Sequence, residues 1–316
     1  MAVYTDVAIE ELVAFLADYD VGSILAMKGI AEGVENSNYL VMTDGGSYIL
    51  TLYEKRVKEE DLPFFLGLME HLAARGVPCP TPIRDRKGRA LKWLKGKAAA
   101  LISFLEGVSP GVIEARHCSA VGEALAEMHL KGTDFPMHRP NALGLSSWNT
   151  LARQCRARAD EVEPGLADEI SRELDTLHEC WPRGLPCGVI HADLFSDNVF
   201  FRGSRLTGLI DFYFACNDLL AYDIAVCLNA WCFTGEARFD VTRGHALIDA
   251  YSSRRPLDDA ERASLSLLAR GAALRFLLTR LYDWLNPVGG AIVTPKDPGE
   301  FLRVMRYHRH HPSLEP

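Results

Sequence analysis

Three short apolar runs separated by polar segments, between residues 188 and 212, constrain the fold of this chain more than any other feature. Each run has the length of a buried strand, and a turn near residues 202–205 closes the second and third runs into a hairpin. Asp193, Asn198 and Asp211 stand where the runs meet the polar segments. The sequence therefore predicts two carboxylates and one amide at strand ends.

The spacing of these three side chains indicates phosphoryl transfer. Asp193 and Asn198 are five residues apart, as in the D-x-x-x-x-N part of a protein-kinase catalytic loop, and Asp211 follows Asn198 by thirteen residues. Phosphoryl transfer needs a carboxylate beside the acceptor hydroxyl, and a carboxylate with an amide oxygen to hold Mg²⁺ on the ATP phosphates. We expect Asp193 to be the base and Asn198 and Asp211 to be the metal ligands. The loop reads H-A-D and the later strand ends I-D-F-Y, which points away from the protein kinases themselves.

Composition sets the class of protein. The chain has 316 residues, 48% of them hydrophobic and 24% charged, which is typical of a globular protein. A net charge of -8 argues against a general nucleic-acid binder. The sequence shows neither a signal peptide nor an apolar run of about 18 residues, so we expect a cytoplasmic protein without a membrane span. Its eight cysteines form no C-x-x-C pair and are expected to be reduced thiols.

The first third of the chain predicts a small sheet with two helices. Thr5 or Asp6 is expected to cap the first helix. Gly29 and Gly33 lie in the first turn between strands, where kinase-like folds place a backbone loop over the ATP phosphates. A plain hairpin is the alternative for this segment. A proline-rich segment at 76–82 predicts an edge strand, because proline donates no ladder hydrogen bond. The expected strands are 23–31, 38–42, 47–53, 91–94 and 98–104, and the expected helix after the third strand is 59–75.

The third strand lacks the lysine that kinase-like folds usually place there. It reads YILTLY over residues 48–53, and the position of the lysine is occupied by Thr51. Lys28, Lys55 and Arg56 are nearby cations, although such residues are usually solvated surface charges. The next helix has glutamates only near its ends, so the lysine–glutamate pair stays unassigned.

A segment rich in glycine and proline follows the last of these strands and predicts a hinge between two domains, 1–105 and 106–316. In kinase-like folds the hinge backbone holds the adenine ring, and the resemblance described below implies this role for backbone groups at Ser103, Phe104 and Leu105. The second domain is expected to be mainly helical, and its charge runs are expected to be solvated faces. The histidine-rich tail at 293–311 is expected to be an exposed terminus. The predicted helices are 113–129, 146–160, 165–180, 218–231, 240–251 and 258–284.

At the catalytic residues the chain resembles the aminoglycoside phosphotransferase and choline kinase superfamily, whose signature is H-x-D-x-x-x-x-N followed by I-D-F or I-D-W. The resemblance implies an α+β, protein-kinase-like fold of two lobes, with a small antiparallel sheet in the N-lobe and a mainly helical C-lobe. It also implies that Asp223 braces the catalytic loop through backbone hydrogen bonds, with His191 as a further structural support. His129 ends a helix similar to one in the superfamily and is expected to pack or cap rather than react.

Within the superfamily the chain looks most similar to the bacterial type II homoserine kinases. In that family a threonine at the position of Thr51 is normal. The resemblance implies transfer of the γ-phosphate of ATP, with Mg²⁺, to the side-chain hydroxyl of L-homoserine, in threonine biosynthesis. The matching segments are 50–54, 62–65, 188–195, 210–215, 274–276 and 294–298.

The chemistry of homoserine gives an expectation for its binding site. Its carboxylate favours an arginine fork and its ammonium favours a carboxylate. The hypotheses are Arg275 or Arg280 for the carboxylate, and Asp218 or Asp197 for the ammonium. The alternatives are another small-alcohol kinase, acting on choline, ethanolamine, an aminoglycoside or a thiosugar, a catalytically silent nucleotide-binding regulatory protein, and a non-enzymatic scaffold. The sequence defines no oligomeric state.

Overall fold

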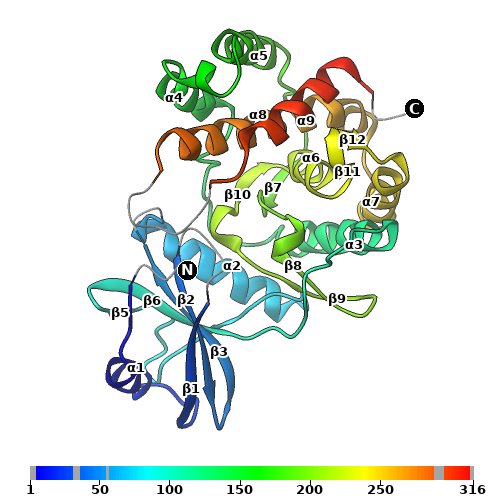
Figure 1. The fold of residues 1–316 in the computed structure, drawn as a ribbon. Coiled ribbons are helices and arrows are strands. Elements are labelled where there is room, and N and C mark those ends of the chain that lie inside the picture. The colour runs from blue at the N-terminus through cyan, green and yellow to red at the C-terminus, as the bar shows by residue number, and fades with distance from the viewer. Residues whose placement is uncertain (1–4, 31–35, 55–56, 288–294, 314–316) are drawn as a thin grey trace. The chain divides into compact units, whose positions relative to one another are not determined.

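A computed structural model describes residues 5–30, 36–54, 57–287 and 295–313 (Figure 1). The described chain divides into two compact units, one ending at Glu106 and the other beginning at Gly107. The first unit contains an antiparallel sheet with two α-helices, and the second is mainly helical. This is the α+β composition that the sequence predicts. No helix among the described residues combines the length and apolar character needed to cross a membrane.

The sheet of the first unit has six strands, with β1, β2, β3, β6 and β4 as successive neighbours and β5 paired to β6. All pairings are antiparallel. β4 lies at the edge, as its proline predicts. The strands are β1 (Ile24–Ile30), β2 (Asn36–Thr43), β3 (Gly46–Tyr53), β4 (Pro82–Ile83), β5 (Lys92–Leu94) and β6 (Lys97–Ser103).

Two helices accompany this sheet, α1 (Ile9–Leu16) and α2 (Leu62–Ala74), the latter preceded by a 3₁₀ turn at Glu59–Asp61. The apolar side of α1 packs with residues of β3 and β6 in one buried cluster. The expected cap at Thr5 or Asp6 is wrong. The helix starts one turn later, because Glu11 accepts the N–H of Ala8 while the Thr5 hydroxyl donates to Glu54.

The second unit contains seven α-helices and three two-stranded sheets within the described residues. Helix α6 is buried along nearly its whole length, and Asp258 caps α8 by accepting the N–H of Glu261, as expected. The helices are α3 (Ala115–Lys131), α4 (Leu145–Cys155), α5 (Leu166–Cys180), α6 (Leu220–Trp231), α7 (Val241–Arg254), α8 (Asp259–Leu285) and α9 (Pro298–His310). The strands are β7 (Cys187–Ile190) with β10 (Cys216–Leu219), β8 (Val199–Arg202) with β9 (Arg205–Leu209), and β11 (Phe233–Thr234) with β12 (Arg238–Phe239).

The histidine-rich tail is not an exposed terminus, and that expectation is wrong for most of the segment. Residues from Pro298 to His310 form α9, which packs against α8 and is capped by Asp297. His308 is buried and its Nε2 lies 2.7 Å from Oδ1 of Asn229. The helix forms because apolar side chains recur at a helical spacing that buries one face. These are Phe301, Leu302, Val304 and Met305.

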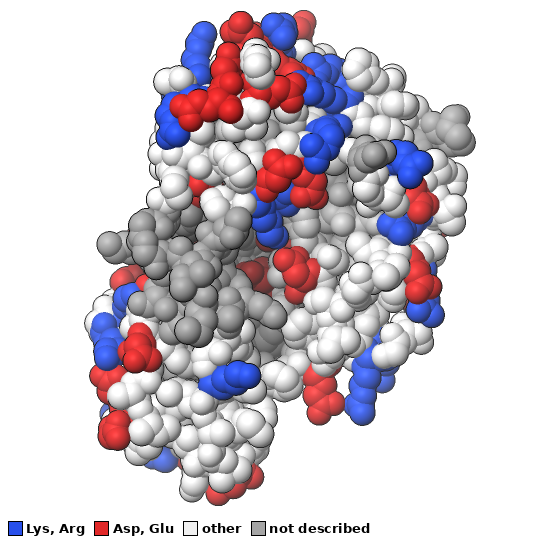
Figure 2. All heavy atoms as spheres, in the orientation of Figure 1, with Lys and Arg blue, Asp and Glu red and all other residues white. Residues whose placement is uncertain are grey.

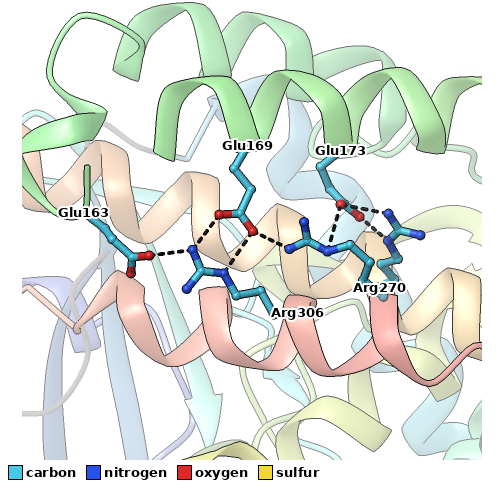
Figure 3. Close-up of polar contacts among 6 residues, drawn as sticks. Glu163, Glu169, Glu173, Arg270 and Arg306 are labelled. Carbon is cyan, nitrogen blue, oxygen red and sulfur yellow. Dashed lines mark hydrogen bonds and ion pairs between the residues drawn. The ribbon is translucent and has the colours of Figure 1, made fainter. Parts of the chain in front are cut away.

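Helix α5 is joined to α8 and α9 by ion pairs, so its charges are not all a solvated face (Figure 3). Arg306 of α9 donates to Glu169 and Glu163, both at 2.5 Å, and Arg270 of α8 binds Glu173. The side chains of Glu169 and Glu173 are 11% and 2% exposed. Hydrogen bonds from Arg306 bring the pKa of Glu169 to about 2, although burial opposes them.

Candidate active site

The loop after β7 has an unusual backbone that is held by a buried carboxylate. Ala192 has a φ of 63°, in the left-handed region that residues with a Cβ rarely adopt. Asp223 accepts the backbone N–H groups of His191 at 2.7 Å and Ala192 at 2.8 Å. These are the contacts expected of a residue that braces the catalytic loop. These hydrogen bonds offset the conformational free energy that the left-handed backbone of Ala192 costs. They also fix the direction in which the side chain of Asp193 projects from the loop.

Asp223 is entirely buried in the first turn of α6. Burial by itself would raise the pKa of its carboxyl, but the hydrogen bond from His129, the nearby histidines and the backbone N–H of His191 lower it below the usual range. The positive end of the helix dipole also favours the charged form there. Asp223 is therefore an ionised, acceptor-only group behind the catalytic loop. His129 of α3 does more than pack in the core, because its ring is hydrogen-bonded to Asp223.

A second buried side chain holds the same loop from α8. Arg275 is 3% exposed and donates to the carbonyl of Ala192, and its Nη1 lies 3.8 Å from Oδ1 of Asp193. Its guanidinium also lies over the rings of Phe214 and Phe276, 5.2 and 4.2 Å from their centroids. Arg275, one of the two arginines expected to bind the substrate carboxylate, thus contacts the catalytic loop itself.

Asp193 presents a partly accessible carboxyl, with 19% of its side chain exposed. Burial raises the pKa of this carboxyl, and the charges of Arg275 and His191 oppose that shift. Its backbone N–H points to Nδ1 of His191 at 3.3 Å, while Nε2 of the same ring lies 2.9 Å from the carbonyl of Ile210. Because a carbonyl only accepts, Nε2 carries the proton and Nδ1 accepts. His191 thereby connects the catalytic loop to the strand end that precedes Asp211.

The hairpin brings the two expected metal ligands to the same end. Val199 pairs with Leu209, and the N–H of Ile210 donates to the carbonyl of Asn198 at 3.0 Å, so Asn198 and Asp211 leave adjacent strands. The amide nitrogen of Asn198 donates to the carbonyl of Asp193 at 2.8 Å, which leaves the amide oxygen for another partner.

The donor chemistry of this pair fits Mg²⁺. The two side chains supply hard oxygen donors, and Mg²⁺ uses one or two such groups together with phosphates and water. No cluster of three or more His, Cys, Asp or Glu side chains suited to a metal occurs in the described parts of the chain. A Mg²⁺ ion held by Asn198 and Asp211 would take further ligands from nucleotide oxygens and water.

The other expected substrate residues differ in the hydrogen bonds and ion pairs that they form within the protein. Arg280 pairs with Glu300 at 2.5 Å, and Asp218 accepts a hydrogen bond from Asn141 at 2.7 Å. Asp197 is mostly exposed and lies opposite Lys296, with 3.6 Å between Oδ2 and Nζ. The sequence reasoning did not single out Lys296, although it belongs to the segment 294–298 that supported the family resemblance.

The expected nucleotide contacts in the first unit are only partly described. Gly29 lies within β1 opposite Tyr39 rather than in a turn, and Gly33 falls outside the described residues. The N–H groups of Ser103 and Phe104 donate to Thr81 and Ser47. The backbone of Leu105 makes no hydrogen bond with any other described residue, so both its N–H and its carbonyl stay candidates for the adenine.

Thr51 is the residue that we expect at the usual position of the lysine. It is buried in β3 and donates to Asn38 at 2.8 Å. Among the cations considered as replacements, Lys28 is exposed on β1, and Lys55 and Arg56 fall outside the described residues.

Comparison with known proteins shows strong similarity over the whole chain. The profile of the phosphotransferase enzyme family matches residues 26–257. A homoserine kinase from Rhizobium etli (strain CIAT 652) is 61% identical, and one from Methylobacterium sp. (strain 4-46) is 62% identical. Each comparison covers 98% of this chain and 96% of the relative.

Solved structures of low sequence identity share the fold. An amicoumacin kinase in complex with AMP-PNP and Ca²⁺ has a TM-score of 0.70 at 15% identity, covering 98% of this chain and 96% of that one. A choline/ethanolamine kinase family protein from Mesorhizobium loti has a TM-score of 0.68 at 16% identity, covering 96% and 99%. The predicted kinase-like fold class is confirmed.

Proposed function

We propose a function for this chain from the premise that it belongs to the phosphotransferase enzyme family, as its family match and its homoserine kinase relatives show. It is a kinase that transfers the γ-phosphate of ATP to the side-chain hydroxyl of L-homoserine. The observation that carries this conclusion is identity of about 60% to homoserine kinases over nearly the whole chain. The catalytic loop described above supplies the groups that this reaction needs.

Asp193 acts as the base in this proposal. Its carboxylate accepts the proton of the homoserine hydroxyl as the hydroxyl oxygen bonds to the γ-phosphorus and the bond from that phosphorus to the bridging oxygen breaks, releasing ADP. The raised pKa of Asp193 brings its basicity closer to that required at neutral pH, while Arg275 at 3.8 Å favours the ionised form.

Asn198 and Asp211 would hold the magnesium ion, which when bound neutralises charge on the phosphate oxygens. The Asn198 amide has a second task, because its nitrogen fixes the carbonyl of Asp193. Asp223, His191 and Arg275 keep the loop in its left-handed conformation, so the base is positioned before the substrate arrives. Such positioning contributes to catalysis without contact with the reacting atoms.

The nucleotide site is a less defined part of the proposal. We assign the adenine to the backbone near Leu105 and the phosphates to the segment that contains Gly29 and Gly33, in keeping with the family resemblance. We also propose that the enzyme acts in the cytoplasm, where ATP and amino acids are supplied.

The proposal is tested by ATP turnover of the purified protein with Mg²⁺ against L-homoserine, L-serine, choline and kanamycin in parallel. Selective turnover of homoserine, lost with a chelator and restored by excess Mg²⁺, is the expected result. Turnover of another acceptor alone would keep the chemistry and replace the substrate. ATP binding without turnover of any acceptor would favour a silent nucleotide-binding protein, the reading suggested by Thr51 in place of lysine.

A further inference from the structure

Two exposed side chains of opposite charge face each other beside the catalytic base. Nζ of Lys296 lies 3.6 Å from Oδ2 of Asp197, and 65% of each side chain is exposed. An ion pair this exposed contributes only about 0–1 kcal/mol, because water solvates both charges well. The pair therefore opens at little cost when a ligand offers each group a partner of its own.

The loop that carries Asp197 makes contacts with other parts of the second unit. Asp197 lies between Asp193 and Asn198 in a 3₁₀ turn, Ser196–Asn198, and its carbonyl accepts the hydroxyl of Ser109 at 3.3 Å. The neighbouring ring of Phe195 packs against Phe276 of α8, with 4.8 Å between centroids. Asp197 is thus held on the same rigid loop as the base.

Lys296 lies just before the start of α9. It directly precedes Asp297, whose side chain accepts the N–H of Gly299 and caps α9. Its Nζ lies 5.9 Å from the centroid of Phe195. The charge of Asp197 raises the pKa of Asp193 and the charge of Lys296 lowers it. Both charged groups therefore lie close enough to the base to interact with it electrostatically.

Three of the four charged residues that the sequence suggested for binding homoserine have other partners. Arg275 binds the carbonyl of Ala192 in the core, and Arg280 pairs with Glu300. The carboxylate of Asp218 accepts from Asn141. Lys296 and Asp197 are more exposed to solvent than Arg275, Arg280 and the residues that these arginines contact.

We propose that Lys296 and Asp197 together bind the two charged groups of the amino-acid substrate, the ammonium of Lys296 taking its carboxylate and the carboxylate of Asp197 its ammonium. This inference rests on the proposed function and assigns its specificity. An α-amino acid carries its carboxylate and its ammonium group on the same carbon atom. Its recognition therefore needs a cationic and an anionic side chain close to each other. Replacing one exposed ion pair by two charge-assisted hydrogen-bonded pairs is favourable. The hydroxyl, on the far end of the side chain, then extends toward Asp193.

The test compares three acceptors in the full-length enzyme: L-homoserine, L-homoserine amide, which lacks the carboxylate charge, and 4-hydroxybutyrate, which lacks the ammonium. The variants are Lys296→Met and Asp197→Asn, with Lys87→Met and Asp175→Asn as exposed controls. Thermal unfolding of each variant checks that the fold is intact.

The wild type is expected to prefer homoserine over both analogues. Lys296→Met should raise the KM for homoserine about 10- to 100-fold, the usual effect of losing a hydrogen bond between charged groups, and should leave the KM for ATP unchanged. It should abolish the preference over the amide but keep the preference over 4-hydroxybutyrate. Asp197→Asn should do the converse, and Lys296→Arg should retain the wild-type preferences.

Three results would overturn the inference while leaving homoserine kinase activity in place. One is a wild type that uses the amide as well as homoserine. Another is Lys296→Met with an unchanged preference over the amide. The third is Lys296→Met with a raised KM for ATP only, which would assign Lys296 to the nucleotide phosphates. Failure of the wild type to phosphorylate homoserine would instead contradict the proposed function itself.

Discussion

Nε2 of His129 lies 3.1 Å from Oδ2 of Asp223, and both side chains are fully buried. Nδ1 of the same ring lies 2.8 Å from the hydroxyl of Tyr251, which also receives a hydrogen bond from Arg255 at 3.3 Å. Because the Asp223 carboxylate only accepts, Nε2 donates to it. Tyr251 therefore connects the ring of His129 to Arg255. This series of hydrogen bonds ends at Asp223, the residue that holds the catalytic loop.

Tyr251→Phe removes the hydrogen-bond partner of Nδ1 of His129 and leaves a buried ring nitrogen unsatisfied. We expect the free energy of unfolding to fall by about 1–3 kcal/mol and kcat to fall several-fold, with KM for homoserine and ATP unchanged. Chemical denaturation and steady-state kinetics measure the two effects. Tyr307→Phe is the matched control, because no described hydrogen bond involves the Tyr307 hydroxyl. A Tyr251 variant indistinguishable from this control would contradict a role for this hydrogen-bond network in holding the catalytic loop.

Arg275→Met should act on turnover rather than on substrate affinity. The guanidinium is buried on the carbonyl of Ala192 and near Asp193, so its loss loosens the loop and removes a positive charge beside the base. We expect kcat to fall about 10-fold or more, with KM for homoserine within about twofold of the wild type, as for an interaction that serves the transition state. A large rise in KM at unchanged kcat would restore the earlier hypothesis of direct carboxylate binding.

Asp193→Asn keeps the shape of the side chain and removes the proton acceptor. We expect kcat to fall by about 10²–10⁴-fold, the range for a positioned general base, while binding of a fluorescent ATP analogue is retained. Turnover like that of the wild type would exclude Asp193 as the base.

Asp211→Asn should weaken Mg²⁺-dependent nucleotide binding, because a carboxylate is the stronger magnesium ligand. Titration calorimetry of ATP at increasing Mg²⁺ should show a higher Mg²⁺ requirement, by about 10-fold or more, as loss of a charged metal ligand implies. An unaltered Mg²⁺ dependence would separate Asp211 from the metal.

The carboxylate of Glu169 should make the second unit sensitive to acid. Its pKa is lowered from 4.5 to about 2, first by the hydrogen bond from Arg306, against the opposing effect of burial. A lowered pKa in the folded state contributes stability that is present above pH 4.5 and lost as the pH falls toward 2. Glu169→Gln should therefore reduce the free energy of unfolding by about 3 kcal/mol at neutral pH and by little near pH 2.

Denaturation of wild type and Glu169→Gln between pH 7 and pH 2 measures this difference. Asp168→Asn, an exposed neighbour on α5, is the control. A difference between wild type and Glu169→Gln that stays constant over this range would show that the ion pairs in Figure 3 do not produce it.

The sequence by itself determined the features that depend on residues close together in the chain. The spacing of Asp193, Asn198 and Asp211 indicated the chemistry, because the loop and hairpin that present them are local structures. The antiparallel sheet and most helices were likewise predicted from periodicity and caps. The edge position of β4 followed from a single property of proline.

Only the tertiary structure decided which distant side chains act on that loop. Arg275 is separated from Ala192 by 83 residues. The sequence did not reveal this partner, because an arginine in an apolar helix gives no local signal of the group that it binds. The same holds for Lys296 and Asp197, and for the burial of α9 in place of an exposed tail. Packing of α8 and α9 beside the loop sets these pairings, and packing is a property of the whole fold rather than of local spacing.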